Sequence, residues 1–348
     1  MKMNHQLQSD KERKERSKYR RCFQGLCVLC FFALSLMAAS AQQQIAPKPK
    51  AEAPAKAQLK IPVWVERADG SFREDAKRQQ FKIFIDDREV AIRGFQTSRS
   101  GTVLLVVFDT VADLARVDAA RSALQAAIAD LSEQYWVGLL RAQDGLSVIQ
   151  EPTADHKILN DKISAVQVSG KAGLLDTLEP VAQLAVAMLK KASVRLSVLY
   201  ITDSAIGSYR ADYLNPVINS SDAGDLSRRF SDRAVQERMS RTVESLARYT
   251  VPIYVLHLAH RGDPLNLAYQ SGLERIATES GGTAAFCRTS DEIRPALNGI
   301  INRIRSGYVL AIDPPNTKRK SARIRVEVQS NEGQPPARIT HINQLRVK

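Results

Sequence analysis

The sequence feature that most constrains the fold is an unbroken apolar run that ends in a carboxylate. Residues 103–108 are six consecutive apolar residues, and Asp109 follows directly. A continuous run rich in β-branched residues is typical of a strand buried on both faces, as in the centre of a parallel α/β sheet. Such sheets bind ligands in the crevice at the carboxyl ends of their strands. Asp109 is therefore the first candidate for a functional residue.

Two further apolar runs, at 194–201 and 251–258, repeat this pattern, and segments with helical spacing separate the runs. The spacing of apolar residues predicts helices at 114–134, 155–166, 173–191, 233–249, 265–279 and 290–306. Strands that alternate with helices in this way indicate βαβ units, and hence a largely parallel sheet flanked by helices. We therefore expect an α/β domain over residues 99–306.

Short runs of alternating apolar and polar residues lie on both sides of this domain, at 58–98 and 307–348. The first flank contains three such runs, with a hairpin predicted at Asp86-Asp87, and turn signals also divide the second flank. Both flanks are therefore expected to form antiparallel strands. The economical arrangement pairs them into one small β module, into which the α/β domain is inserted.

The amino terminus has the pattern of an export signal. A basic region ends at Arg21, an apolar stretch follows, and Ala39-Ser40-Ala41 forms a small-residue cleavage site, so residues 1–41 are predicted to be a signal peptide. The alternative, an uncleaved anchor helix, stays open because the apolar stretch is long. Residues 42–57, rich in Pro, Ala, Lys and Gln, are predicted to be a disordered linker. The body of the protein is expected to be secreted or periplasmic.

Composition and motifs limit the classes of function. The formal net charge is +13, but the basic surplus is spread along the chain and aromatic residues make up only 6%. Nucleic-acid binding needs a basic face with stacking aromatics, so we expect no nucleic-acid partner. The sequence has no Gly-rich phosphate loop, no G-x-S-x-G elbow and no H-E-x-x-H motif. We therefore expect a binding protein and no enzyme.

Several segments carry a family resemblance. Residues 273–316 comprise a predicted helix ending in Gly-Gly, a strand, a second helix and a strand of the form YxLxxxP. Together with the strand VPIYVL at 251–256 and the hairpin at 81–95, this stretch resembles the secreted von Willebrand factor A-related proteins of bacteria. The resemblance implies a Rossmann-like von Willebrand A domain. It also implies a non-catalytic module for protein binding or adhesion.

The resemblance further implies a divalent-metal site at the strand ends. In the family, an Asp-x-Ser-x-Ser loop, a Thr and a second Asp hold the metal, and a carboxylate of the partner completes the shell. Here the loop reads DTVAD, from Asp109 to Asp113 with Val111 at the first Ser position, while the Thr position is Ala172 and the second Asp is Asp203. Val111 and Ala172 offer no side-chain oxygen to a hard cation.

We therefore expect a degenerate metal-ion-dependent adhesion site and no tightly bound cofactor. Weak binding of Mg²⁺ by Asp109, Asp113 and Asp203 stays open, as does neutralisation of these carboxylates by Lys171. The rival function is a metal-dependent hydrolase, which would use the same carboxylates with His257, or a metal-dependent adhesion protein. A hydrolase needs these side chains to converge in a closed pocket, whereas a binding module presents an open rim.

The long polar stretch 206–232 follows Asp203. It is therefore expected to leave the sheet at the edge formed by the carboxyl ends of its strands, which we call the rim and where Asp109 also lies. Loops of this length inside a compact domain are usually functional or disordered. This one carries residue types that dominate interface hot spots: Tyr209, Arg210, Tyr213, Arg228, Arg229 and Phe230. We expect these residues to bind a protein or a cell-envelope component. A partner-free insertion is the alternative. A membrane contact is expected only through the signal segment, if it is uncleaved.

Overall fold

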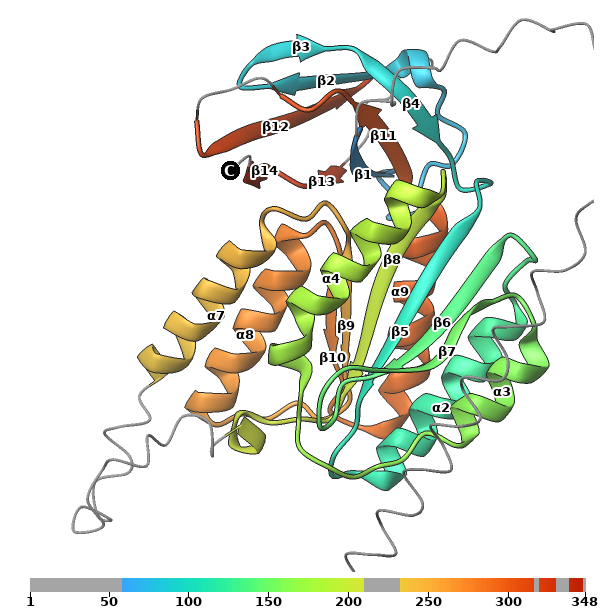
Figure 1. The fold of residues 1–348 in the computed structure, drawn as a ribbon, viewed down its shortest axis with the longest axis vertical. Helices are drawn as coiled ribbons and strands as arrows, with labels where there is room; N and C mark the ends of the chain where they lie inside the picture. Colours follow the sequence, from blue (N-terminus) through green and yellow to red (C-terminus); the bar gives the residue numbers. More distant parts are fainter. Residues whose placement is uncertain (1–57, 210–231, 316–318, 330–337, 347–348) are drawn as a thin grey trace, which may run out of the picture. The chain divides into compact units, whose positions relative to one another are not determined.

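A computed structural model describes residues 58–209, 232–315, 319–329 and 338–346 of the 348-residue chain (Figure 1). The predicted signal peptide and linker lie outside these ranges. Among the described residues, no helix is both long enough and apolar enough to cross a membrane. Cys287, the one cysteine beyond the predicted signal peptide, is buried and free.

A six-stranded sheet forms the centre of the α/β domain. Its strands are β5 (Thr102–Asp109), β6 (Tyr135–Arg141), β7 (Ser147–Thr153), β8 (Arg195–Thr202), β9 (Ile253–His257) and β10 (Ala284–Phe286). They lie in the order β10-β9-β8-β5-β6-β7, and every pair is parallel except β6 with β7. Each residue of β5 and of β8 is buried, as the continuous apolar runs predict.

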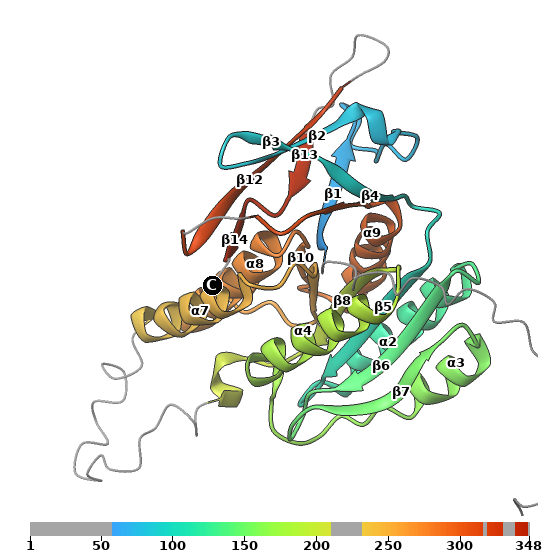
Figure 2. The ribbon, with the colours of Figure 1, turned by 45° about the horizontal axis from the view of Figure 1, so that its top comes forward.

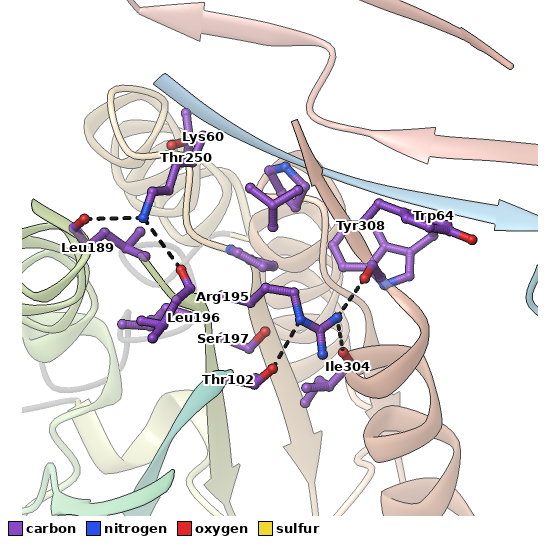
Figure 3. Close-up of a pocket in the computed structure, with 15 residues that line it drawn as sticks. Lys60, Trp64, Thr102, Leu189, Arg195, Leu196, Ser197, Thr250, Ile304 and Tyr308 are labelled. Carbon is purple, nitrogen blue, oxygen red and sulfur yellow. Dashed lines mark hydrogen bonds between the residues drawn. The ribbon is translucent and has the colours of Figure 1, made fainter. Parts of the chain in front are cut away.

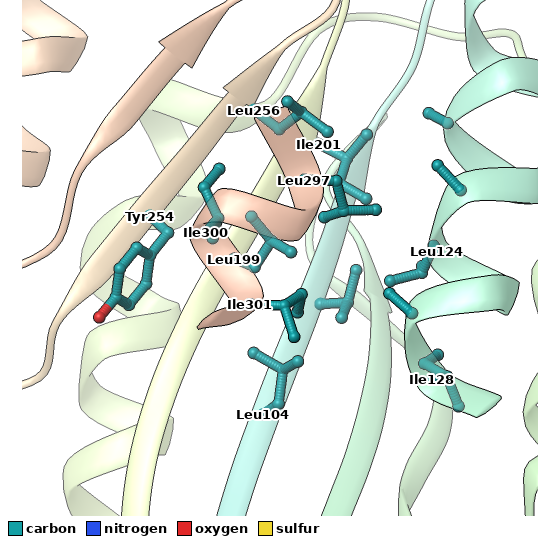
Figure 4. Close-up of a cluster of buried hydrophobic side chains, with 14 of the residues drawn as sticks. Leu104, Leu124, Ile128, Leu199, Ile201, Tyr254, Leu256, Leu297, Ile300 and Ile301 are labelled. Carbon is teal, nitrogen blue, oxygen red and sulfur yellow. The ribbon is translucent and has the colours of Figure 1, made fainter. Parts of the chain in front are cut away.

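Helices cover both faces of this sheet. They are α2 (Leu114–Ala129), α3 (His156–Ser164), α4 (Leu174–Lys191), α7 (Asp232–Leu246), α8 (Pro264–Glu279) and α9 (Ile293–Ser306). Because side chains of a strand alternate between faces, Leu104, Val106 and Phe108 of β5 pack with α2 and α9 (Figure 4). Val103 and Leu105, on the other face of the strand, pack with α4 and its neighbours α7 and α8.

The two flanks form a β module of two four-stranded sheets (Figure 2). Its strands are β1 (Leu59–Glu66), β2 (Phe81–Ile85), β3 (Arg88–Val90), β4 (Ile92–Gln96), β11 (Tyr308–Ile312), β12 (Ser321–Val328), β13 (Arg338–His341) and β14 (Gln344–Arg346). Strand β1 pairs with β11 and β13, and β2 pairs with β12. The expected pairing of the amino-terminal flank with the carboxyl-terminal flank is confirmed.

The boundaries of the module's strands differ from the sequence prediction in two places. The third predicted run divides at Ala91 into β3 and β4, and the last run divides at Ile342-Asn343 into β13 and β14. In both cases the chain passes from one sheet of the module to the other, and periodicity alone gives no sign of this. The hairpin predicted at Asp86-Asp87 is present, with φ of 47° and 65°, as a tight turn with two left-handed residues requires.

Residues of the β module contact the carboxyl ends of the helices, which lie at the amino end of the sheet. The Lys60 ammonium on β1 donates to the carbonyl of Leu189 near the end of α4, at 3.2 Å (Figure 3). It also donates to the carbonyl of Ala192, just beyond the helix, at 3.1 Å. The Trp64 indole donates to the carbonyl of Arg303 in α9, at 2.7 Å. The backbone N–H of Arg346 donates to Ala247, just beyond α7. The module thus supplies donors to carbonyls that a helix end leaves without partners.

Arg195, the first residue of β8, joins the two parts from within the α/β domain. Its side chain is buried, and its guanidinium donates to the carbonyl of Gly307 at 2.6 Å and to Thr102 at 3.0 Å (Figure 3). The Tyr135 hydroxyl accepts a further hydrogen bond from it, at 3.2 Å. The guanidinium also donates to the carbonyls of Ile304 and Arg305 in the last turn of α9, both at 3.3 Å. A cation at the negative end of the helix dipole is stabilising. One side chain therefore holds the α9 end and the crossing into β11.

Candidate functional site

The strand order places a crevice beside Asp109. Numbered along the chain from β5 to β10, the six strands lie in the order 3-2-1-4-5-6 from the β7 edge. In α/β sheets of this order, ligands bind where strands 1 and 4 meet. Those strands are β5, which ends at Asp109, and β8, which Asp203 follows. As predicted, the two residues are neighbours: the N–H of Asp203 lies 3.4 Å from the carbonyl oxygen of Asp109.

The Asp109 carboxylate is fully buried and accepts hydrogen bonds from three separate segments. Oδ1 accepts from the N–H of Gly173, at 2.8 Å, and Oδ2 accepts from the Thr202 hydroxyl, at 3.0 Å. The Tyr209 hydroxyl lies 3.5 Å from Oδ2. Burial raises the pKa of Asp109, and the hydrogen bonds oppose this rise. The carboxylate therefore ties β5 to β8, to the start of α4 and to the turn after β8.

A buried cluster of hydroxyl groups continues from Asp109. The Ser204 hydroxyl lies 2.8 Å from that of Thr202, 3.3 Å from that of Tyr209 and 3.2 Å from that of Tyr269. Tyr209 belongs to a short 3₁₀ turn, Ile206–Tyr209, and is only 2% exposed. Burial holds its pKa well above the ordinary value, so its hydroxyl keeps the proton that it donates. Tyr209 thus covers Asp109 from the solvent side of the strand.

Asp203 is also committed to contacts within the protein. Its Oδ1 accepts from the N–H of Val111 at 2.7 Å, and its Oδ2 accepts from the N–H groups of Ala112 and Asp113 at 2.9 and 2.6 Å. The side chain is 1% exposed. Asp203 therefore fixes the loop after β5 through three consecutive backbone donors, and both of its oxygens accept hydrogen bonds.

Asp113 makes its side-chain contacts at the start of α2. It is the N-cap residue of the helix: Oδ1 accepts from the N–H of Arg116 at 3.1 Å, and the other oxygen lies 3.2 Å from the Arg116 guanidinium. An aspartate at this position satisfies a free N–H group of the first turn and complements the helix dipole. The role that the geometry assigns to Asp113 is therefore helix capping.

Comparison with known proteins gives likenesses of fold. No family model and no curated protein matches the sequence. Solved structures that are similar include the PilB minor pilin from Streptococcus sanguinis, at 15% identity and a TM-score of 0.44 over 63% of each chain. The chain therefore spans less than two thirds of that pilin. The von Willebrand factor type A protein from Catenulispora acidiphila is 9% identical, with a TM-score of 0.43 over 86% of this chain and 74% of its own.

The sheet order, the helices on both faces and the carboxylates at the central strand ends agree with the resemblance drawn from the sequence. The α/β part of the chain therefore has the Rossmann-like arrangement that the resemblance implies: a mostly parallel sheet with helices on both faces. A further similar structure is the proximal thread matrix protein 1 of the mussel byssus, whose metal-ion-dependent adhesion site holds zinc. It is 10% identical, with a TM-score of 0.41 over 62% of this chain and 48% of its own.

The residues at the ends of the central strands do not fit the divalent metal that the resemblance implies. Asp203 has both oxygens on backbone N–H groups, and Asp113 caps a helix. Val111 and Ala172 carry no side-chain oxygen, and Asp109 lies beneath Tyr209. Within the described ranges, no three side chains of His, Cys, Asp or Glu come close enough together to hold a metal ion. The predicted ligand set Asp109, Asp113 and Asp203 is thus brought to one rim without converging on one point.

The alternative hydrolase also lacks a converging set of side chains. His257 is buried, with Nε2 2.9 Å from the carbonyl oxygen of Ser204 and Nδ1 accepting from the N–H of Ala259 at 3.3 Å. This pairing assigns the neutral tautomer with the proton on Nε2. Burial lowers the pKa of His257 to about 4, so the ring stays neutral at neutral pH. Both ring nitrogens are used by the backbone, so the geometry gives the ring a structural role.

The predicted partner-binding residues are only partly described. Arg210, Tyr213, Arg228, Arg229 and Phe230 lie outside the described residues. Tyr209 lies inside them and is buried against Tyr269, at 5.9 Å between ring centroids, so the expectation that it projects toward a partner is wrong. It is a large aromatic residue at the end of a short turn, and its hydroxyl satisfies a buried acid. Nothing in the polar sequence around it distinguishes the two roles.

Sequence reasoning missed the residues that complete the Asp109 cluster. Thr202 and Ser204 flank Asp203 directly, and a run of three polar residues after a buried strand is the signal that could have found them. Gly173 carries another signal: a Cβ there would lie 1.9 Å from the carbonyl oxygen of Ala142. Only glycine lets this backbone N–H reach Asp109. Tyr269, on α8, is far away in sequence and gave no signal.

Proposed function

We propose that the protein is an exported, non-catalytic binding module of the von Willebrand A class, which contacts a protein partner through the carboxyl-end rim of its sheet without a metal ion. The observation that carries this proposal is the occupation of Asp203 by three backbone N–H groups. A carboxylate used in this way supports the shape of the rim loop, and most of its acceptor capacity is used within the protein. Contact with a partner must then come from the surface of the rim itself.

Two exposed leucines support protein contact at this rim. Leu114 opens α2 with 58% of its surface exposed, and Leu267 lies in the first turn of α8 with 45% exposed. Both helices begin at the carboxyl end of the sheet, because each follows a parallel strand. Two exposed apolar side chains at the end of the sheet that binds ligands in this fold class are the apolar surface that a partner would cover there. Arg261 and Arg288 lie exposed on the neighbouring loops after β9 and β10.

Export is proposed from the sequence of residues 1–41, and the partner is then a protein of the cell envelope or its surroundings. The expected absence of enzyme activity rests on the same contacts that occupy Asp109, Asp203 and His257. Adhesion in the family sense, through a metal and the carboxylate of a partner, is not supported by this donor set.

The test is capture of a partner from envelope extract by immobilised protein, with mass spectrometry to identify what is retained. The double variant Leu114→Glu/Leu267→Glu should lose the partner, because two charges would be placed in an apolar contact. The matched control is Leu184→Glu, which changes a leucine with 36% exposure on α4. A chelator should leave capture unchanged. Retention by the double variant, or loss of capture with chelator, would contradict the proposal.

A further inference from the structure

A polar cleft lies away from the rim, where the β module meets the α/β domain. Its volume is about 680 Å³, within the range of small-molecule sites. Four segments line it: the loop after β1, the crossing from β4 to β5, the start of β6 and the last turns of α9. A smaller hollow of about 280 Å³ continues from it and shares Phe72, Glu74 and Arg99. The cleft is independent of the crevice at Asp109.

Two arginines outnumber the one carboxylate, that of Glu74, among the residues that line this cleft. Arg99 comes from the crossing between β4 and β5, and Arg305 comes from the last turn of α9. Both side chains are exposed, and neither guanidinium has an ion-pair or hydrogen-bond partner among the residues that the structure describes. Arginine is suited to planar anions, since its fork of donors matches a carboxylate or a phosphate. Two such groups that line one hollow favour an anionic ligand.

The remaining lining favours hydroxyl groups over a bare ion. Asn302 and Gln134 present side-chain amides, which both donate and accept hydrogen bonds. Glu74 accepts a hydrogen bond from the Ser306 hydroxyl at 3.0 Å. This side of the cleft therefore carries a carboxylate that accepts from hydroxyl groups. Phe72 is half-buried and adds an apolar surface, with the Arg303 guanidinium 5.7 Å from its ring centroid. An aromatic face beside planar amides suits the alternating C–H and O–H surface of a sugar ring.

We propose that this cleft binds an anionic sugar, with Arg99 and Arg305 on the acid group and Asn302, Gln134 and Glu74 on the hydroxyls. The acid could be the carboxylate of a uronic acid or the phosphate of a sugar phosphate. These two sources share the chemistry that the cleft recognises. The inference does not rest on the function proposed for the rim, because none of these residues belongs to it.

The test is isothermal titration calorimetry of the full chain with glucuronate, glucose 6-phosphate and glucose, at low salt. At least one anion should bind, and glucose should bind about tenfold more weakly or not at all, because it lacks the charge-assisted hydrogen bonds. The anion that binds more tightly identifies the source. Absence of heat with both anions, or equal affinity for glucose, would overturn the proposal.

Variants decide whether the cleft is the site. Arg99→Gln/Arg305→Gln should weaken anion binding at least about tenfold, since two charged donors are lost. The control Arg294→Gln, an exposed arginine on α9 outside the cleft, should leave affinity unchanged. Asn302→Asp keeps both arginines and adds a negative charge, so it should weaken anion binding by a similar factor. This variant keeps the test valid if the double variant folds poorly. Unchanged affinity in Asn302→Asp and in a folded double variant would place the anion elsewhere.

Discussion

The two ends of the central sheet carry opposite chemistry. At the amino end, Lys60, Trp64 and Arg195 donate to helix carbonyls, and the β module covers the strands (Figure 3). At the carboxyl end, Asp109 and Asp203 accept from backbone N–H groups and hydroxyls, and no second module covers the described rim. Donors to helix carbonyls thus lie at one end of the sheet, and buried carboxylate acceptors lie at the other.

This difference follows from the direction of the chain. In a parallel α/β sheet, most helices end at the amino end of the strands and begin at the carboxyl end. Helix ends leave carbonyls without partners, and helix starts leave N–H groups without partners, so the first need donors and the second need acceptors. Asp113 and Asp263 cap α2 and α8 for this reason. Carboxylates at the rim therefore have a structural use that does not depend on a metal.

Removal of Arg195 should cause the largest loss of stability. In Arg195→Met, the buried carbonyls of the α9 end and the hydroxyls of Thr102 and Tyr135 lose their shared donor. Several unsatisfied buried groups should lower the free energy of unfolding by about 4 kcal/mol in urea denaturation. Arg294→Met, on the exposed side of α9, should change it little. Equal effects of the two variants would show that Arg195 is not the tie between the two parts.

Through His257, the free energy of unfolding should fall by about 3 kcal/mol between pH 6.5 and pH 4. Burial lowers its pKa from 6.5 to about 4, so the unfolded chain binds this proton in a range where the folded protein does not. The contribution is complete above pH 6.5 and is lost as pH falls toward 4. Asp109 acts with the opposite sign, because its raised pKa gives a contribution that is lost as pH rises through that value.

The variant His257→Gln isolates the histidine contribution. Glutamine retains a donor for the Ser204 carbonyl and does not titrate, while Asp109 is present in both proteins. The difference in free energy of unfolding between wild type and variant should therefore shift in favour of the variant between pH 6.5 and 4. A difference that is constant over this range would show that His257 titrates normally in the folded protein.

Loss of the Asp203 carboxylate should have an intermediate effect. In Asp203→Ala, the N–H groups of Val111, Ala112 and Asp113 lose their acceptor, which should cost about 2 kcal/mol in chemical denaturation. Asp203→Asn keeps one acceptor oxygen and should cost less. If both variants were as stable as the wild type, the Asp203 carboxylate would not stabilise the carboxyl end of the sheet, and the comparison of the two ends would be wrong.

The sequence predicts the central part of the fold because the signals there are local. Residues 103–108 and 194–201 are continuous apolar runs, and β5 and β8 are buried throughout. Because both runs are expected in one parallel sheet, Asp109 and Asp203 are expected at the same edge of it, where the carboxyl ends of the strands lie. The hairpin at Asp86-Asp87 is predicted for the same reason, since both residues tolerate the left-handed region that the turn requires.

The sequence could not predict the partners of these side chains. Lys60 lies more than 120 positions before the carbonyls that it contacts, and no periodicity relates them. Tyr209 lies in a polar stretch, where an aromatic residue fits a docking surface and a buried hydroxyl cluster equally well. The resemblance to a metal-binding family drew attention to Asp109 and Asp203, but the hydrogen bonds that these carboxylates accept from N–H groups depend on backbone geometry. Contacts between distant segments decide these roles.

The most direct test of the central claim, that the rim carboxylates are structural acceptors, is the melting temperature by calorimetry with and without millimolar Mg²⁺ or Mn²⁺. The wild type should show almost no shift, because a ligand without an open site adds no stabilisation. Asp109→Ala should melt at a lower temperature than the wild type and should be equally insensitive to both ions. A rise of several degrees with either ion that disappears in Asp109→Ala would contradict the account.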